Sequence, residues 1–222
     1  MRVTHLILIR HGQASFGQEN YDQLSPLGCT QMQRLGSLFP TTTHLKLNLN
    51  HTQIHVGHLQ RQQDSMKYVL DQFPKLSTSM RETLNQNTLI ASALNEFDFQ
   101  HILKVHQDRL FDEPQSNALV HRGGIHAFHF FIAQWMLGTL SSDDLGGIPT
   151  WIQFQQGVVE YLDDLHIRDL SQNSLETQDD DRYHLCFTSA GVITAFIAHV
   201  MKMNPIQSLA LLMKIKNSSI TI

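Results

Sequence analysis

The stretch Leu8-Ile9-Arg10-His11-Gly12-Gln13 decides the fold of this 222-residue chain. The segment from Val3 to Ile9 is rich in apolar residues and predicts a buried strand, which ends at the polar pair Arg10 and His11. Open α/β sheets bind ligands at the carboxyl ends of their strands, so this pair stands where a ligand is expected. A neutral imidazole is a competent nucleophile toward phosphorus, and a guanidinium can hold phosphoryl oxygens with two bonds. Glycine lets a substrate approach the backbone closely. The stretch therefore indicates phosphoryl chemistry.

The composition is that of a globular protein, with 41% hydrophobic and 16% charged residues. The formal net charge of -4 favours neither nucleic acid nor an anionic membrane as a partner. An anionic substrate therefore needs a local positive pocket, to which Arg10 would contribute. The two cysteines, Cys29 and Cys186, match no metal or redox spacing, which predicts neither a metal site nor a cofactor and favours a reducing compartment.

The ends and the apolar stretches of the chain predict a cytoplasmic protein. The first strand begins directly after Met1-Arg2, which leaves no room for a signal peptide. The most apolar stretch, Gly191 to Met201, is too short to span a bilayer.

Strand and helix patterns alternate along the chain. Ser25-Pro26 is typical of a helix start, and apolar residues at helical spacing continue to Phe39. We expect a helical insertion that caps the sheet at about 99–170, followed by a solvated acidic loop. The alternation predicts a three-layer α/β sandwich with a mostly parallel central sheet. The other expected elements are one or two strand segments within Thr41–Val56, a helix from Gly57 to Pro74, a strand at Thr88–Ala91, a strand at Tyr183–Thr188, a helix at Val192–Met201, a helix from Asn204-Pro205 to Lys214, and a strand at Ser218–Ile222.

Three later segments also place polar residues just after predicted strands. They are Gly57-His58-Leu59-Gln60-Arg61, Leu94-Asn95-Glu96 and Thr188-Ser189-Ala190-Gly191. Together with Arg-His-Gly, these segments resemble the histidine phosphatase superfamily, also called phosphoglycerate mutase-like. The resemblance covers the sheet framework at residues 3–98 and 183–222 and says little about the helical insertion. We expect one domain over 1–222 that includes this insertion as a helical cap.

The resemblance implies a role for each of four residues. His11 would attack phosphorus and form a phosphohistidine, while Arg10 and Arg61 would bind the phosphoryl oxygens. Glu96 would be the general acid that protonates the leaving oxygen and then activates water. The alternatives are an ordinary polar turn at Arg-His-Gly, a solvated Arg61 at a helix start, and an exposed Glu96 with Asp98 acting in its place.

The chain departs from the family pattern at its fourth segment. Ser189 stands where the family usually carries a second histidine, and Ala190 stands where it carries a glycine. Serine offers only a neutral hydrogen bond, and losing a charged contact in such a site can slow a reaction by about a hundred- to a thousand-fold. Backbone N–H groups at the helix start near Ala190 can still bind phosphate. The family's usual loop asparagine falls at Gly17, so Gln13 or Ser15 would supply that contact.

These observations predict a phosphomonoester hydrolase that acts through a phosphohistidine at His11, with turnover lowered by Ser189. The ligand class is a phosphorylated small molecule or a phosphopeptide, and a homodimer is left open. One alternative is a catalytically impaired module on the same fold that binds a phospho-ligand or a protein. A phosphoglycerate mutase is the less favoured alternative.

Several histidines lie outside the motifs. His51, His55 and His58 fall across a strand and a loop, which is not typical of a metal site. Whether His121 or His126 reaches the pocket and replaces the missing histidine is left open.

Overall fold

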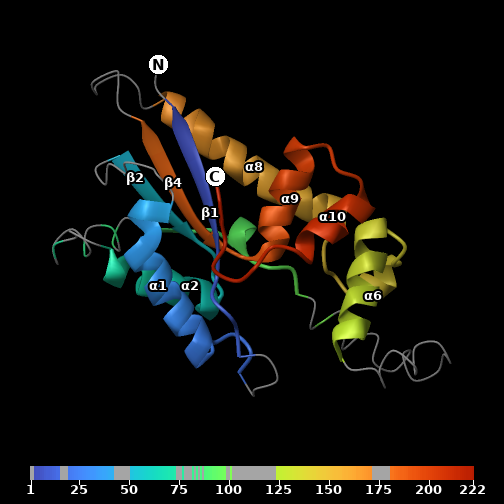
Figure 1. Ribbon diagram of the computed structural model, residues 1–222. Helices are drawn as coiled ribbons and strands as arrows, with labels where there is room; N and C mark the ends of the chain where they lie inside the picture. Colours follow the sequence, from blue (N-terminus) through green and yellow to red (C-terminus); the bar gives the residue numbers. More distant parts are fainter. Residues whose placement is uncertain are drawn as a thin grey trace. The chain divides into compact units, whose positions relative to one another are not determined.

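The computed structural model describes residues 3–15, 20–42, 51–73, 77, 82, 84, 86, 88–98, 101, 124–171 and 181–222 (Figure 1). The chain forms two compact units. The first comprises Met1–Glu96, Glu160–Ile193 and Ile215–Ile222, and the second comprises Phe97–Val159 and Thr194–Lys214. All residues predicted for the site belong to the first unit.

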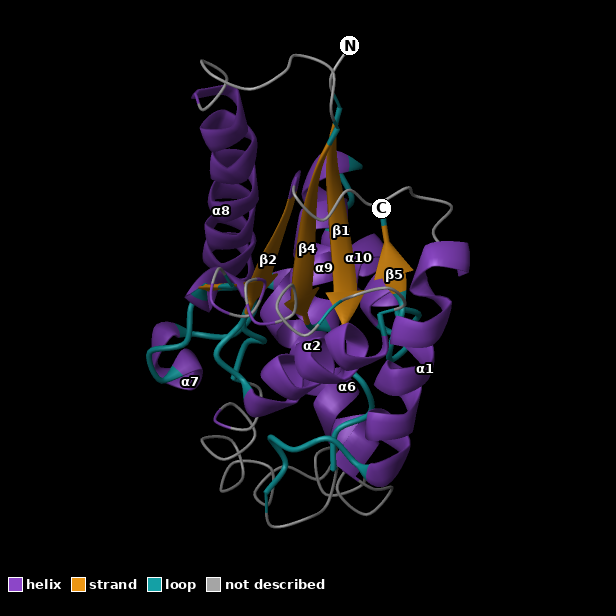
Figure 2. Cartoon of the chain, turned by 90° about the vertical axis from the view of Figure 1, so that its left-hand side faces the viewer, coloured by secondary structure: helices purple, strands orange, loops and turns teal. Residues whose placement is uncertain are grey.

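A five-stranded sheet with the order β3-β2-β4-β1-β5 forms the centre of the first unit. Four strands are parallel, and the short β5 pairs antiparallel to β1 (Figure 2). The mixed, mostly parallel α/β sheet that the sequence predicted is confirmed. The strands are β1 (Thr4–Arg10), β2 (Thr52–Val56), β3 (Leu89–Ile90), β4 (Arg182–Thr188) and β5 (Ile220–Thr221).

The register of the central pair aligns the ends of β1 and β4. Ile9 pairs with Phe187, and Arg10 pairs with Thr188. Because both strands run in the same direction and end side by side, the residues that follow them emerge at one edge of the sheet.

Helices α1 (Pro26–Thr42) and α2 (Gln60–Gln72) pack against each other and cover one face of the sheet. They approach closely at Gly36, where an added Cβ would lie 2.3 Å from the carbonyl oxygen of Val69. The core of this face is formed by Ile7, Ile9, Leu24, Met32, Phe39, Ile54, Val56, Val69, Leu70, Phe73, Leu84, Tyr183, Leu185 and Phe187.

Helix α1 extends into the region expected to hold one or two strand segments. Thr41 and Thr42 form the end of that helix. Residues 43–50 lie outside the described part of the chain, and the strand itself begins at Thr52.

Buried polar side chains on the opposite face of the sheet contact α8 (Trp151–Ser171). Side chains alternate along a strand, so His55 faces away from its core neighbours Ile54 and Val56. Its Nδ1 lies 2.8 Å from the hydroxyl of Tyr161, and its Nε2 lies 2.9 Å from Nδ1 of His184. The first unit therefore has helical layers on both faces of its sheet.

The second unit is helical in its described part. It contains α6 (Gly124–Leu137), α7 (Ser142–Leu145), α10 (Pro205–Leu212) and the first half of α8. Helix α9 (Ala190–Val200) begins in the first unit and ends in the second. Aromatic rings form the core of the second unit, and the indole of Trp135 donates to the carbonyl of Pro149 at 2.9 Å. None of the helices that the structure describes combines the length and the apolar character needed to cross a membrane.

Candidate active site

Four sequence-predicted residues come together where the parallel strands end. His11 follows β1 and Ser189 follows β4, and the N–H of His11 donates to the carbonyl of Thr188 at 2.9 Å. Arg61 lies in the first turn of α2, just after β2, and Glu96 follows β3 and a 3-10 turn at Ser92–Leu94. Short links from four strands thus bring the four side chains to one edge of the sheet.

The imidazole of His11 has a fixed tautomer. Its Nδ1 lies 2.7 Å from the carbonyl oxygen of Gly12, which can only accept a hydrogen bond, so Nδ1 carries the proton. The Nε of Arg61 lies 3.3 Å from Nε2, and an arginine can only donate, so Nε2 is unprotonated. The lone pair of Nε2 therefore faces the arginine.

Burial and positive charge hold His11 in its neutral form. The residue is only 4% exposed, and burial lowers its pKa from 6.5 to about 3, with a further contribution from the Arg61 guanidinium. Arg10 acts in the same direction, while the bond to Gly12 opposes the shift. The imidazole is thus uncharged at neutral pH.

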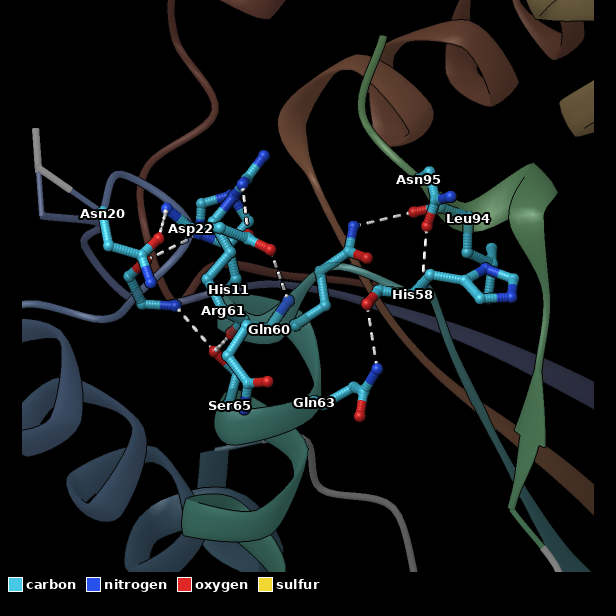
Figure 3. A network of polar contacts seen from close by, with 12 residues as sticks. His11, Asn20, Asp22, His58, Gln60, Arg61, Gln63, Ser65, Leu94 and Asn95 are labelled. Carbon is cyan, nitrogen blue, oxygen red and sulfur yellow. Dashed lines mark hydrogen bonds and ion pairs between the residues drawn. The ribbon is translucent and has the colours of Figure 1, made fainter. Parts of the chain in front are cut away.

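Arg61 is held by three neighbours, as Figure 3 shows for two of them. Its Nη1 donates to Oδ1 of Asp22 at 2.6 Å, and its Nε faces His11. The Tyr21 ring lies 5.1 Å from the guanidinium carbon, a cation–π distance. The arginine is 4% exposed, so it is not the solvated helix-start residue of the alternative interpretation.

A serine on α2 connects the His11 loop to the helix that carries Arg61. The backbone N–H of Gly12 donates to Oγ of Ser65 at 3.1 Å, and that hydroxyl donates to the carbonyl of Arg61 at 2.6 Å. The same loop lies tightly against α1, because an added Cβ at Gly28 would lie 2.1 Å from the carbonyl oxygen of Gln13. Two helices therefore fix the backbone on either side of His11.

The C-terminal segment anchors Arg10. Its guanidinium donates to the carbonyl of Ile215, and its backbone N–H donates to the carbonyl of Ser219. Its Nε is buried and has no partner among the residues that the structure describes. Burial lowers the pKa of this arginine, while Glu96 acts in the opposite direction. The side chain thus keeps a donor available at the site.

Glu96 is a partly buried carboxyl group beside both arginines. The N–H of Gly191 lies 3.4 Å from its Oε2, and its Oε1 is buried with no partner within the described part of the chain. Burial raises its pKa, and this effect outweighs the opposing charges of Arg61 and Arg10. Asp98, the alternative acid, is exposed and accepts a hydrogen bond from the N–H of His101.

Ser189 is fully buried, at 0% exposure, next to Glu96. Its Oγ is buried, and its contact with the Glu96 carboxyl acts to lower the pKa of that group. Ala190 follows as the first residue of α9. The segment is held in place by Thr188, whose hydroxyl donates to the carbonyl of Leu94 at 2.7 Å.

The structure does not bring Gln13 to this cluster. Its side chain is exposed, and its amide oxygen accepts a hydrogen bond from the Ser25 hydroxyl at 3.0 Å, at the start of α1. The N–H of Ser15 donates to the carbonyl of Gln23. Whether His121 or His126 replaces the second histidine stays open, because His121 and the side chain of His126 lie outside the described part of the chain, as does Gly17.

Sequence reasoning missed two residues of the site, Tyr21 and Asp22. Both precede the helix start at Ser25-Pro26 and belong to no motif, so only their aromatic and acidic character shortly after the Arg-His-Gly loop was available as a signal. Within the described residues, no three His, Cys, Asp or Glu side chains are grouped in a way that could hold a metal ion.

Comparison with known proteins gives structural but not sequence neighbours. No family model and no curated protein sequence matches the chain. Among solved structures, phosphoglycerate mutase from Bacillus anthracis is similar with a TM-score of 0.60 at 13% identity, over 99% of this chain and 87% of that chain. A mutant phosphoserine phosphatase from Entamoeba histolytica, solved with phosphoserine, is similar with a TM-score of 0.58 at 16% identity, over 99% and 89% of the two chains.

A third neighbour is a mycobacterial glucosyl-3-phosphoglycerate phosphatase, with a TM-score of 0.57 at 17% identity, over 97% of this chain and 88% of that chain. The shared architecture extends over nearly the whole chain, and the motif residues of the sequence meet at one sheet edge. The chain therefore has the fold of the histidine phosphatase, or phosphoglycerate mutase-like, superfamily.

Proposed function

We propose that the protein is a phosphomonoester hydrolase that acts through a phosphohistidine at His11 and turns over slowly because Ser189 replaces a histidine. One observation carries this proposal. The unprotonated Nε2 of His11 lies at the same sheet edge as two arginines and a carboxyl group whose pKa is raised. This combination supplies a nucleophile, phosphate-binding cations and a proton donor.

In the first step, the Nε2 lone pair of His11 attacks phosphorus and forms an N–P bond. The P–O bond to the substrate oxygen breaks, and the proton of the Glu96 carboxyl passes to that oxygen. The guanidinium groups of Arg10 and Arg61 stabilise the negative charge on the equatorial phosphoryl oxygens. Phosphoryl oxygens compete with Nε2 for the Nε–H of Arg61, so substrate binding frees the nucleophile.

In the second step, the Glu96 carboxylate takes a proton from a water molecule as the water oxygen attacks phosphorus. The N–P bond breaks and its electron pair returns to Nε2, which releases inorganic phosphate. Burial of Glu96 supports both roles, because a carboxyl group with a raised pKa can give and take a proton closer to neutral pH.

The expected rate of turnover depends on Ser189. The buried Ser189 hydroxyl offers one neutral hydrogen bond to a phosphoryl oxygen, whereas a protonated imidazole would offer a charged one. The loss of such a contact lowers turnover by about a hundred- to a thousand-fold. Binding is less affected, because both arginines and the start of α9 remain.

The proposed ligand class is a phosphorylated small molecule or a phosphopeptide. Two structural neighbours support the first choice, because they are named as phosphatases of glucosyl-3-phosphoglycerate and of phosphoserine. No cofactor or metal is included in the proposal, and the protein is proposed to act in the cytoplasm.

The test is hydrolysis of p-nitrophenyl phosphate by the wild type, by His11→Ala and by His199→Ala as a control. His199 is an exposed histidine on α9, so we expect the control to keep wild-type activity and His11→Ala to lose it. Calorimetry with inorganic phosphate accompanies the assay. Phosphate binding without hydrolysis in the wild type would overturn the proposal and favour a module that only binds phospho-ligands.

A further inference from the structure

Asp22 has no assigned role, yet it contacts Arg61, whose Nε lies 3.3 Å from Nε2 of His11. Its Oδ1 accepts the Arg61 Nη1 bond at 2.6 Å, and its Oδ2 accepts the backbone N–H of Gln60 at 2.8 Å (Figure 3). One carboxylate thus connects the arginine side chain to the first turn of the helix that carries it. The loop is fixed by Asn20, whose side-chain oxygen accepts the N–H of Asp22 at 3.1 Å.

These contacts set the orientation of the guanidinium. The group is planar and rigid, so fixing Nη1 on one side determines where Nε points on the other. The Nε of Arg61 points at Nε2 of His11, 3.3 Å away, and the ring of Tyr21 lies on one side of the guanidinium carbon. Without the Asp22 bond, the Arg61 side chain would keep its charge but lose this fixed direction.

The negative charge of Asp22 disfavours the binding of an anionic phosphate group nearby. A carboxylate next to a phosphate site repels a bound dianion and so weakens ground-state binding. We therefore expect Asp22 to contribute by orienting the Arg61 guanidinium. A fixed orientation of this group matters most in the transition state, where negative charge spreads over the equatorial oxygens.

We propose that Asp22 is the positioning residue of Arg61 and holds it for stabilisation of the transition state rather than for binding of the phosphate ground state. This inference rests on the proposed function. According to this inference, the loop at Tyr21-Asp22 contributes to the rate of phosphoryl transfer.

The experiment uses Asp22→Asn, which keeps the shape and one acceptor oxygen but removes the charge. We expect kcat on p-nitrophenyl phosphate to fall by about ten- to a hundred-fold, the value of one charged hydrogen bond. The affinity for vanadate, which resembles the transition state, should weaken to a similar degree. The affinity for inorganic phosphate should change by less than about threefold or become tighter.

Asp64→Asn is the matched control. Asp64 is a carboxylate in the first half of α2, and it accepts a hydrogen bond from the Gln60 side chain at 2.7 Å, whereas the ion pair of Arg61 is with Asp22. We expect this variant to behave as the wild type does. If Asp22→Asn fails to fold, Asp22→Glu tests the same point, because a displaced carboxylate should lower kcat while phosphate binding is kept.

Equal losses for vanadate and phosphate, or equal behaviour of the Asp22 and Asp64 variants, would overturn the inference. The two affinities are measured by calorimetry, so they report on Asp22 even if the wild type hydrolyses nothing. A wild type without hydrolysis contradicts the proposed function. Vanadate and phosphate affinities that weaken equally in Asp22→Asn contradict the role of Asp22.

Discussion

The Nε of Arg61 lies 3.3 Å from Nε2 of His11, on the side of the imidazole opposite to the bond between Nδ1 and Gly12. One ring nitrogen therefore faces a carbonyl and the other faces a cation. This arrangement fixes the neutral tautomer and directs the Nε2 lone pair toward the arginine that, in the proposed mechanism, also binds a phosphoryl group.

The first prediction concerns the pH dependence of hydrolysis. In the proposed mechanism the acid form of Glu96 is the active form, so kcat/KM should fall as pH rises through the raised pKa of that carboxyl. His11, with a pKa of about 3, stays neutral above that pH and adds no rising limb. In Glu96→Gln, turnover of alkyl phosphates should fall by about a hundred- to ten-thousand-fold, and the falling limb should disappear. The same falling limb in the glutamine variant would remove Glu96 from the mechanism.

The second prediction concerns stability. His11 has a pKa of about 3 in the folded state and about 6.5 in the unfolded state, so the unfolded chain binds the extra proton between these values. Wild-type stability should therefore fall as pH drops through this window. His11→Gln lacks this penalty, and relative to the wild type it should gain about 2.5 kcal/mol between about pH 7 and 4.5. Urea unfolding at the two pH values measures the difference, and parallel losses in both proteins would contradict the low pKa.

The third prediction concerns the close approach of α1 to the His11 loop. Gly28→Ala places a methyl group against the Gln13 carbonyl, so the loop must shift, and we expect a loss of about 1–3 kcal/mol together with reduced activity. Gly157→Ala is the control, because an added Cβ at this position on α8 meets no atom within 4 Å. This change should leave activity unchanged and stabilise the helix by about 0.5–1 kcal/mol. Thermal melting measures the stability of the two variants, and the hydrolysis assay measures their activity. Equal stability and activity in Gly28→Ala and Gly157→Ala would show that the contact between α1 and the His11 loop is not rigid.

The fourth prediction concerns the missing histidine. Ser189→His with Ala190→Gly should raise turnover, because a protonated imidazole adds a cation beside the phosphoryl oxygens. Position 189 is fully buried, so the glycine at 190 is included to make room for the ring. Steady-state hydrolysis is compared with that of the wild type, of His11→Ala and of Ala190→Gly alone. No gain in a folded double variant that still binds phosphate would mean that another residue already fills the role.

The sequence allowed the sheet and most of the site edge to be predicted. A strand that stops at Arg10-His11 and another that stops at Thr188-Ser189 must meet at one edge once the sheet is parallel. Local patterns contain that information, so the positions of the Arg61 and Glu96 segments followed as well.

Contacts between distant loops and strands could not be predicted in this way. Asp22 meets Arg61 only because the loop before α1 folds onto the start of α2, and no periodicity reports that contact. The pair His55 and His184 depends on strand register, which places two buried imidazoles from separate strands within 2.9 Å. A histidine with no local motif gave no sign of such a partner.

The central claim is that the phosphoryl group passes through His11, and direct capture of the intermediate tests it. The wild type is mixed with a phosphomonoester, quenched in alkali within the first turnover, and digested for peptide mass spectrometry, since phosphohistidine survives base. The account predicts a phosphoryl group on Nε2 of His11 that disappears at the rate of turnover. Steady hydrolysis with no phosphoryl group on His11 at any time would contradict it.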